Sequence, residues 1–401
     1  MRILIVNKFW YPRGGDCVVA MANAKLLRRM GHDVGVFTME YPSNDNDSHI
    51  VGCTSRVDFA GSAGQKLRYL CRVMGGAGVK RDFTQALQTF KPQIVHLHNV
   101  HSYLSPIVAK LAHEHGCRVV WTMHDYKLLC PVYSCLREGR PCRDCVEHPL
   151  DVVNNRCMKH SLPASIAALI EASQWNRERL LQWVDTFVCP SEFMAQQLRL
   201  AGIPEDKIAV LHNAMPAERI DTSPITAGRA DYCCYVGRLS HEKGIDTLAQ
   251  AASRLPFTLK VAGDGPLADQ LRHRYAHVGN IEWLGRLEAP QVAALLRLAR
   301  FSVIPSEWWE NCPLGVIESL CAGTPVVGTR MGGIPELLDD ACGVLAEPGD
   351  PEVLAKAMQQ AWSQRWDYAS IARKAHATFD EQTHCRALIR IYQTIHSESA
   401  V

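Results

Sequence analysis

Two segments in the second half of the 401-residue chain place charged side chains beside predicted helix starts. In residues 237–244 (GRLSHEKG), Arg238 and Lys243 lie in one loop, ahead of a helix that is predicted to begin near Ile245. Two cations beside a helix N-terminus suit a diphosphate group, because the helix dipole adds positive potential there. A solvated basic loop is the alternative interpretation.

The other segment is residues 307–318 (EWWENCPLGVIE), which runs into a second predicted helix. Pro313 suits the first position of that helix, which places Glu310 in the preceding loop and Glu318 in the second turn. A carboxylate in an otherwise apolar helix needs a polar partner, and the hydroxyl groups of a ligand would provide one. Taken alone, each glutamate is better explained as an ordinary solvent-facing acid.

The first half of the chain contains a glycine pair and a group of histidines in comparable places. Gly14 and Gly15 form a turn between the first predicted strand and a helix, where backbone amides can approach an anionic ligand. A dinucleotide-binding G-x-G-x-x-G pattern is absent from this turn. His124 follows a predicted strand, and the histidines near the end of the strand before it are His96, His98 and His101. This grouping predicts a polar active site, and metal binding is the alternative, although no H-E-x-x-H pattern occurs.

Short apolar runs alternate with segments of helical period along most of the chain, which is typical of parallel βαβ units. The predicted strands cover residues 3–7, 34–38, 94–98, 118–122, 187–190, 208–212, 233–236, 259–262, 301–304 and 326–329. Residues 215–231, rich in Pro, Ser, Thr and Gly, are interpreted as a linker. We therefore predict an α/β fold of two doubly wound, Rossmann-like domains, residues 1–214 and 232–380, with ligand at the strand ends that face a central cleft. A C-terminal helix over residues 381–401 is expected to pack on the first domain.

Taken together, these motifs resemble family 4 of the retaining glycosyltransferases, of the type that builds bacterial surface polysaccharides. The matching sequences are Gly14-Gly15, His124-Asp125, GRLSHEKG at 237–244, AGDGPL at 262–267, and the Glu310-x7-Glu318 pair followed by CAGTPVVGTRMGGIPEL at 321–337. The resemblance implies the GT-B fold, in which two Rossmann-like domains face a cleft that holds a nucleotide sugar.

The resemblance also implies roles for residues of the second domain. Arg238 and Lys243 would hold the donor diphosphate and neutralise the leaving group, and Glu318 would bind the ribose hydroxyls. Glu310 would contact the donor sugar together with the backbone that follows it. That backbone belongs to Asn311, Cys312, Pro313 and Leu314.

Three further assignments follow from the same resemblance. His124 would lie beside the anomeric centre, so the implied catalytic residues are His124, Glu310, Arg238 and Lys243. The loop of Gly14 and Gly15 would close over the phosphates, and Arg286 falls in the segment that contacts the base. The acid that often stands two positions after the glycine pair is replaced here by Cys17.

We therefore predict retaining transfer of a sugar from a UDP- or GDP-sugar to a glycan, on a lipid-linked acceptor. Since no strong D-x-D motif is present, fixed positive charge would replace a divalent ion, and activity is expected to be independent of metal and of any cofactor. Two alternatives keep the fold. One is a non-catalytic scaffold that binds nucleotide sugars, and the other is a nucleotide-sugar epimerase.

Sixteen cysteines occur in the chain, and five of them follow closely after His124. The single C-x-x-C pair with its neighbours suggests a structural zinc site at Cys130, Cys142, Cys145 and Cys157. A set of reduced core thiols is the alternative.

The composition, with 47% hydrophobic and 21% charged residues, excludes a disordered chain. No apolar run approaches the ~18 residues that cross a bilayer, and residues 1–7 are too short for a signal peptide, so we expect a cytoplasmic protein at the inner face of the membrane. Residues 1–200 carry 24 Lys and Arg against 17 Asp and Glu, with the excess concentrated in residues 56–81. This stretch predicts contact with an anionic membrane and no nucleic acid partner, and a solvated helix explains it equally well.

Overall fold

The computed structural model describes residues 1–45, 47–57, 69–216 and 228–397. The chain divides into two compact units. Unit 1 comprises Met1–Cys135, Cys142–His212 and Gln382–Val401, and unit 2 comprises Leu136–Pro141 and Asn213–Glu381. Among the described residues, no helix combines the length and the apolar character needed to cross a bilayer.

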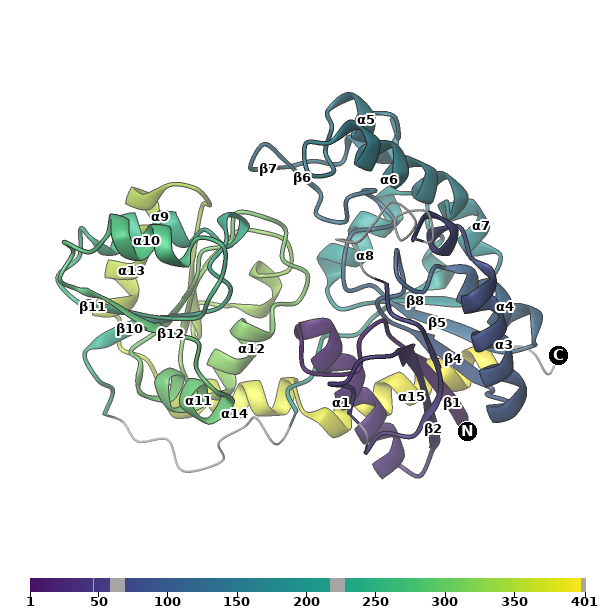
Figure 1. Cartoon of the computed structure of the whole chain (residues 1–401). Coiled ribbons are helices and arrows are strands. Elements are labelled where there is room, and N and C mark those ends of the chain that lie inside the picture. Colours follow the sequence, from purple (N-terminus) through teal and green to yellow (C-terminus); the bar gives the residue numbers. More distant parts are fainter. Residues whose placement is uncertain (46, 58–68, 217–227, 398–401) are drawn as a thin grey trace. The chain divides into compact units, whose positions relative to one another are not determined.

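Unit 1 is built on a parallel seven-stranded sheet of order β3-β2-β1-β4-β5-β8-β9. The strands are β1 (Arg2–Val6), β2 (Asp33–Met39), β3 (Ile50–Thr54), β4 (Ile94–Leu97), β5 (Arg118–Thr122), β8 (Thr186–Cys189) and β9 (Ile208–Val210). The central strands are nearly continuous apolar runs because helices cover both faces of the sheet (Figure 1). The strand order reverses between β1 and β4, so the loops after these two strands diverge and leave room for a ligand.

The described helices of unit 1 surround this sheet. They are α1 (Gly15–Arg29), α3 (Ala77–Phe90), α4 (Ile107–Glu114), α5 (Asp151–Asn154), α6 (Leu162–Gln174), α7 (Arg177–Leu181), α8 (Glu192–Leu200) and α15 (Glu381–Ser397). Although α15 ends the sequence, its buried residues Cys385, Leu388 and Tyr392 share a core with β1 and α1. A short antiparallel hairpin of β6 (Leu136–Arg137) and β7 (Arg140–Pro141) precedes α5.

Unit 2 contains a parallel six-stranded sheet of order β12-β11-β10-β13-β14-β15. Its strands are β10 (Tyr232–Val236), β11 (Thr258–Ala262), β12 (Ile281–Gly285), β13 (Ser302–Ile304), β14 (Val326–Thr329) and β15 (Gly343–Ala346). The helices α9 (Ile245–Ala252), α10 (Ala268–Arg274) and α13 (Pro351–Ser363) pack on one face. Those on the other face are α11 (Ala289–Leu298), α12 (Leu314–Cys321) and α14 (Tyr368–Thr378) (Figure 1). The order reverses between β10 and β13.

The predicted α/β class with two doubly wound parallel sheets is confirmed, and each predicted strand is present within about two residues. The sequence prediction missed the edge strands β3, β12 and β15 and the short hairpin of β6 and β7. In β3 and β12 burial is partial and the apolar pattern is weak. Pro313 is the N-cap of α12 with extended backbone, not its first helical residue. Of the predicted linker 215–231, residues 217–227 lie outside the described part of the chain.

Candidate functional site

Two of the predicted donor-binding residues of unit 2, Lys243 and Glu310, lie in the loops at the point where the strand order reverses. Lys243 ends a short 3-10 helix (His241–Lys243) after β10, and Glu310 lies in the loop after β13. Because β10 and β13 are adjacent and parallel, their carboxyl ends bring these loops together across 67 residues of sequence. Open α/β sheets bind ligands at this place.

Lys243 and Glu310 form a close ion pair in this structure. The Lys243 Nζ lies 2.6 Å from Glu310 Oε1, and the Ser306 hydroxyl donates to the same oxygen at 2.5 Å. The Glu310 side chain is 8% exposed and that of Lys243 is 26% exposed. Burial acts to raise the pKa of Glu310, but attraction to Lys243 and the two hydrogen bonds outweigh it and lower that pKa. The carboxylate therefore holds the Lys243 ammonium group at a fixed place, and part of the Lys243 side chain still faces solvent.

Two glycines allow the backbone to pack closely around this pair. Gly332 has a φ of +61°, and a Cβ there would lie 1.9 Å from the carbonyl oxygen of Glu310. The neighbouring Gly333 amide donates to that same oxygen at 2.8 Å. Gly244 has a φ of +65°, and a Cβ there would lie 1.9 Å from the carbonyl oxygen of Pro305. The GRLSHEKG and GTRMGGIPEL sequences thus carry glycines for the backbone geometry of the Lys243–Glu310 site.

The other predicted residues of unit 2 are spread over the loops after β10 and β12 and over α12 with the loop that precedes it. Arg238 is exposed in the loop after β10, and Arg286 is exposed directly after β12. Glu318 is half-buried on α12, in its second turn as predicted. The backbone of residues 311–314 leads into α12, and the Cys312 carbonyl accepts a hydrogen bond from Asn213 at 3.0 Å.

In unit 1 the predicted histidines His96, His98 and His124 lie close together at the ends of β4 and β5, and His101 packs against Trp121. His98 Nδ1 lies 2.7 Å from His124 Nε2, and the two rings stack. His96 is bound on both sides, by Thr122 Oγ1 and by the Tyr392 hydroxyl, each at 2.7 Å. Burial lowers the pKa of His124 to about 4 and that of His96 to about 3, so both rings are neutral at pH 7. Among the described residues, His98 Nε2 is one of the few buried polar atoms without a hydrogen-bond partner.

Sequence reasoning missed Asp16, which the fold brings to this histidine group. Asp16 lies in the first turn of α1, directly after the predicted glycine pair Gly14 and Gly15, and accepts a hydrogen bond from Asn99 Nδ2 at 2.6 Å. Burial acts to raise its pKa, but the nearby His124 and this hydrogen bond lower it. The family resemblance leads one to expect an acid two positions after the glycine pair, where this chain has the buried Cys17. An acid one residue earlier, at a helix N-terminus, was the available signal.

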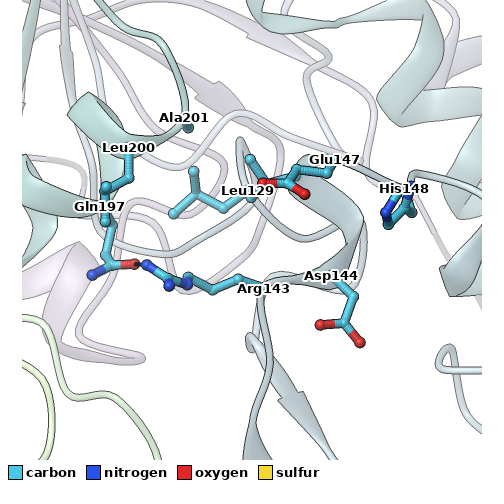
Figure 2. Close-up of a pocket in the computed structure, with 9 residues that line it drawn as sticks. Leu129, Arg143, Asp144, Glu147, His148, Gln197, Leu200 and Ala201 are labelled. Atoms are coloured by element: carbon cyan, nitrogen blue, oxygen red, sulfur yellow. Dashed lines mark hydrogen bonds between the residues drawn. The ribbon is translucent and has the colours of Figure 1, made fainter.

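A separate cavity of about 300 Å³ lies in unit 1 between α8 and the 3-10 helix Asp144–Val146. Its lining combines apolar and polar side chains, among them Leu129, Leu200, Asp144 and Glu147 (Figure 2). Arg143 points across the cavity to Gln197, with a nitrogen–oxygen distance of 3.3 Å. None of the residues that line this cavity belongs to the predicted site.

The cysteines after His124 lie near one another. Burial and the nearby Cys130, Cys157 and Cys142 raise the pKa of Cys145. The thiols of Cys130 and Cys135 are hydrogen-bonded, which lowers the pKa of Cys130 to about 6 and raises that of Cys135. In the part of the chain that the structure describes, no group of three or more His, Cys, Asp or Glu is arranged to hold a metal ion. The zinc site at Cys130, Cys142, Cys145 and Cys157 stays a prediction, which metal analysis of the purified protein would test.

The basic stretch 56–81 is only partly described, because residues 58–68 lie outside the described ranges. Arg72 within it is buried, and its guanidinium donates to Thr54 Oγ1 at 2.8 Å and to the Ser55 carbonyl. Arg81 is exposed but is paired with Asp82 at 2.8 Å. Arg72 thus stabilises unit 1 internally and is not available to a membrane surface.

Two doubly wound units with charged loops at each reversal point define the GT-B fold, and comparison with known proteins supports this class. The chain belongs to Glycosyltransferase Family 4, whose family model matches residues 13–219. A second model, Glycosyl transferases group 1, matches residues 230–364.

Relatives with curated names are distant. An uncharacterised 42.6 kDa protein from the cps region of Klebsiella pneumoniae is 25% identical over 84% of this chain and 87% of its own length. A putative colanic acid biosynthesis glycosyltransferase of Escherichia coli is 26% identical over 62% of this chain and 63% of its own length. An uncharacterised glycosyltransferase of Methanocaldococcus jannaschii is 29% identical over 42% of this chain. The chain spans 47% of the length of that relative.

Solved structures share the fold over nearly the whole chain. Sucrose-phosphate synthase from Thermosynechococcus elongatus has a TM-score of 0.73 at 17% identity, covering 99% of this chain and 100% of that one. Anabaena HepE in complex with UDP has a TM-score of 0.70 at 17% identity, covering 98% and 100%. A lipopolysaccharide outer core galactosyltransferase has a TM-score of 0.68 at 16% identity, covering the full length of both.

Proposed function

We propose that this protein is a retaining glycosyltransferase that moves a sugar from a nucleoside-diphosphate sugar to a lipid-linked glycan in polysaccharide biosynthesis. The observation that carries the proposal is the Lys243–Glu310 pair at the reversal point of the unit 2 sheet, where ligands of such sheets bind. The names of several relatives refer to polysaccharide synthesis, and a structural neighbour was solved with UDP.

In this proposal, unit 2 binds the donor and stabilises its departing diphosphate. The bond between the anomeric carbon and the diphosphate oxygen breaks with oxocarbenium character, so negative charge grows on the diphosphate. Lys243, Arg238 and the N-terminus of α12 supply fixed positive potential for that charge. Because these groups are built into the fold, the reaction is proposed to need no divalent ion, and the acceptor hydroxyl attacks on the face from which the diphosphate leaves.

The remaining assignments rest on the family. Glu318 is proposed to bind the ribose, Arg286 to contact the base, and Glu310 with residues 311–314 to contact the donor sugar. In unit 1, the neutral His124 is proposed to act beside the anomeric carbon, where an imidazole can exchange hydrogen bonds with sugar hydroxyls without competing for charge.

Thermal unfolding with UDP, GDP, ADP and CMP, each without metal, tests the donor site. A ligand at 100 times its dissociation constant adds about 2.7 kcal/mol of stability, which gives a shift of several degrees. We expect one diphosphate to stabilise the protein, and Arg238→Ala to abolish that shift. Arg365→Ala, which removes another exposed arginine of unit 2, should leave the shift intact.

The absence of a shift with every nucleotide would contradict the proposal, whereas nucleotide binding without any sugar transfer would favour the non-catalytic scaffold. Metal independence has its own test, because transfer should survive exhaustive EDTA treatment. A loss of activity that Mg²⁺ restores would contradict that part of the mechanism. Turnover of the nucleotide sugar without any acceptor would indicate an epimerase instead.

A further inference from the structure

The outward face of α6 in unit 1 is apolar. Leu162, Ile166 and Ile170 are 43%, 42% and 45% exposed, and their spacing of four residues places them on one side of the helix. Pro163 in the first turn is exposed as well. Scattered exposed apolar residues are ordinary, but three large ones along a single helix face form a continuous strip that water solvates poorly.

The inward face of α6 shows that this orientation is fixed. Its buried residues are Ser165, Ala168 and Glu171, which are small or polar. The Glu171 carboxylate accepts hydrogen bonds from the Ser102 backbone amide at 2.8 Å and pairs with the Lys127 ammonium at 2.9 Å. Since both side chains of that ion pair are 4% exposed, rotation of the helix would bury unpaired charge. The usual pattern of an amphipathic helix is therefore inverted, with the large apolar side chains facing out.

Cationic residues flank the strip at both ends. Arg156 and Lys159 are exposed just before α6, and Arg179 is exposed shortly after it, next to the exposed Glu178. Within α6 itself, Glu171 is the only ionisable residue, and it is buried. The exposed strip thus carries no charge of its own and lies between basic ends.

Two more exposed apolar side chains lie near the C-terminal end of α6. Trp175, which follows the helix, donates a hydrogen bond from its indole to the Val73 carbonyl at 2.6 Å. Beside Val73 in sequence are Leu70 and Met74, each 38% exposed. They add apolar surface in the neighbourhood of the strip.

We propose that this face of α6 docks on an anionic membrane surface. Aliphatic side chains of an interfacial helix enter the boundary between headgroups and acyl chains, while flanking Lys and Arg bind lipid phosphates. A second copy of the chain fits less well. If two strips packed antiparallel, Arg156 and Lys159 in one copy would face residues 177–179 (Arg-Glu-Arg) in the other, and because the net charge of that segment is also positive, the two ends repel. The strip on α6 lies outside residues 56–81, although Leu70 and Met74 of that stretch lie near it, and the proposal does not depend on the proposed catalytic activity.

Vesicle sedimentation at low salt tests this surface. We expect the protein to bind vesicles that contain phosphatidylglycerol and to bind pure phosphatidylcholine vesicles weakly. Replacing Ile166 and Ile170 with serine removes carbons that would be buried in the bilayer. The partition coefficient should fall at least about tenfold. Replacing Arg156 and Lys159 with serine should lower it about fivefold per cation and reduce its dependence on salt.

A matched control and the unfolding temperature separate docking from misfolding. Leu298→Ser removes an aliphatic side chain of similar exposure, 47%, from unit 2 and should leave vesicle binding unchanged. All variants should unfold within about 2 °C of the unchanged protein, because the substituted residues are exposed.

Three outcomes would overturn the proposal. The first is failure of the unchanged protein to bind anionic vesicles, and the second is equal binding by the Ile166→Ser, Ile170→Ser variant. The third is a dimer, detected by light scattering, that this variant breaks, which would make the face an interface between copies.

Discussion

Removing the ammonium group of Lys243 should destabilise unit 2 in a strongly pH-dependent way. In the unchanged protein the pKa of Glu310 is lowered, so its contribution to stability is present above the pKa of the unfolded chain and is lost as pH falls through the folded value. In Lys243→Ala the carboxylate stays buried without its cation, so burial raises its folded pKa above the unfolded value. The variant should therefore become less stable as pH rises.

The size of the effect follows from the burial of the pair. Breaking a buried ion pair costs about 3–5 kcal/mol, and partial solvent exposure of Lys243 reduces this to about 2–3 kcal/mol at pH 8. At pH 5, where a buried carboxyl with a raised pKa takes up a proton, the cost should fall below about 1 kcal/mol. For a unit of this size, the loss at pH 8 lowers the unfolding temperature by about 5–10 °C.

Urea unfolding at pH 5 and pH 8, monitored by tryptophan fluorescence, measures these differences. Adding Glu310→Gln to Lys243→Ala removes the ionisable group, so the double variant should lose the pH dependence. Arg238→Ala, at an exposed position in the same loop, should change stability by less than about 0.5 kcal/mol at either pH. If Lys243→Ala costs the same at both pH values, the pair does not control the charge of Glu310 and the reasoning fails.

Three other results are expected. Gly332→Ala should cost more than about 3 kcal/mol, because its Cβ would meet the Glu310 carbonyl, whereas Gly349→Ala, also at positive φ but in open space, should cost about 1 kcal/mol. If Gly332→Ala and Gly349→Ala lose similar amounts of stability in urea unfolding, the close-packing argument is wrong. Burial lowers the pKa of His384 to about 4, so the unfolded chain binds its proton first and stability falls as pH drops from 6.5 towards 4. In urea unfolding between pH 7 and pH 5, the stability of His384→Gln should therefore fall by about 2 kcal/mol less than that of the unchanged protein. An equal fall in the two proteins would refute this. Glu171→Gln leaves the Lys127 ammonium buried without its carboxylate and should cost about 3 kcal/mol, while combining it with Lys127→Met should recover most of the loss, as differential scanning calorimetry can show.

The alternation of apolar runs and helical segments was sufficient to predict both sheets. Strands such as β4 and β5 are buried on both faces, so local sequence alone gives a nearly continuous apolar run. The edge strand β12 alternates between exposed and partly buried residues and shares its composition with loops. Its presence depends on pairing with β11, which is a non-local contact.

The predicted site residues of unit 2 were found in the expected loops because parallel strands end at the same edge. The sequence did not indicate that Lys243 and Glu310 contact each other, since either glutamate alone resembled an exposed acid. That contact arises because β10 and β13 are neighbours in the sheet although α9, β11, α10, β12 and α11 separate them in the chain.

Residue types and spacing by themselves determined the class of fold, the family and the segments that are proposed to carry chemistry. Only the tertiary structure decided which charges are paired and which face of a helix is exposed. Asp16 lies near His124 because β1 and β5, which flank β4, are parallel and end at the same edge of the sheet. The isoleucines of α6 face outward because Glu171 is held by Lys127. In each case the energy depends on burial and on partners distant in sequence, which local periodicity does not contain.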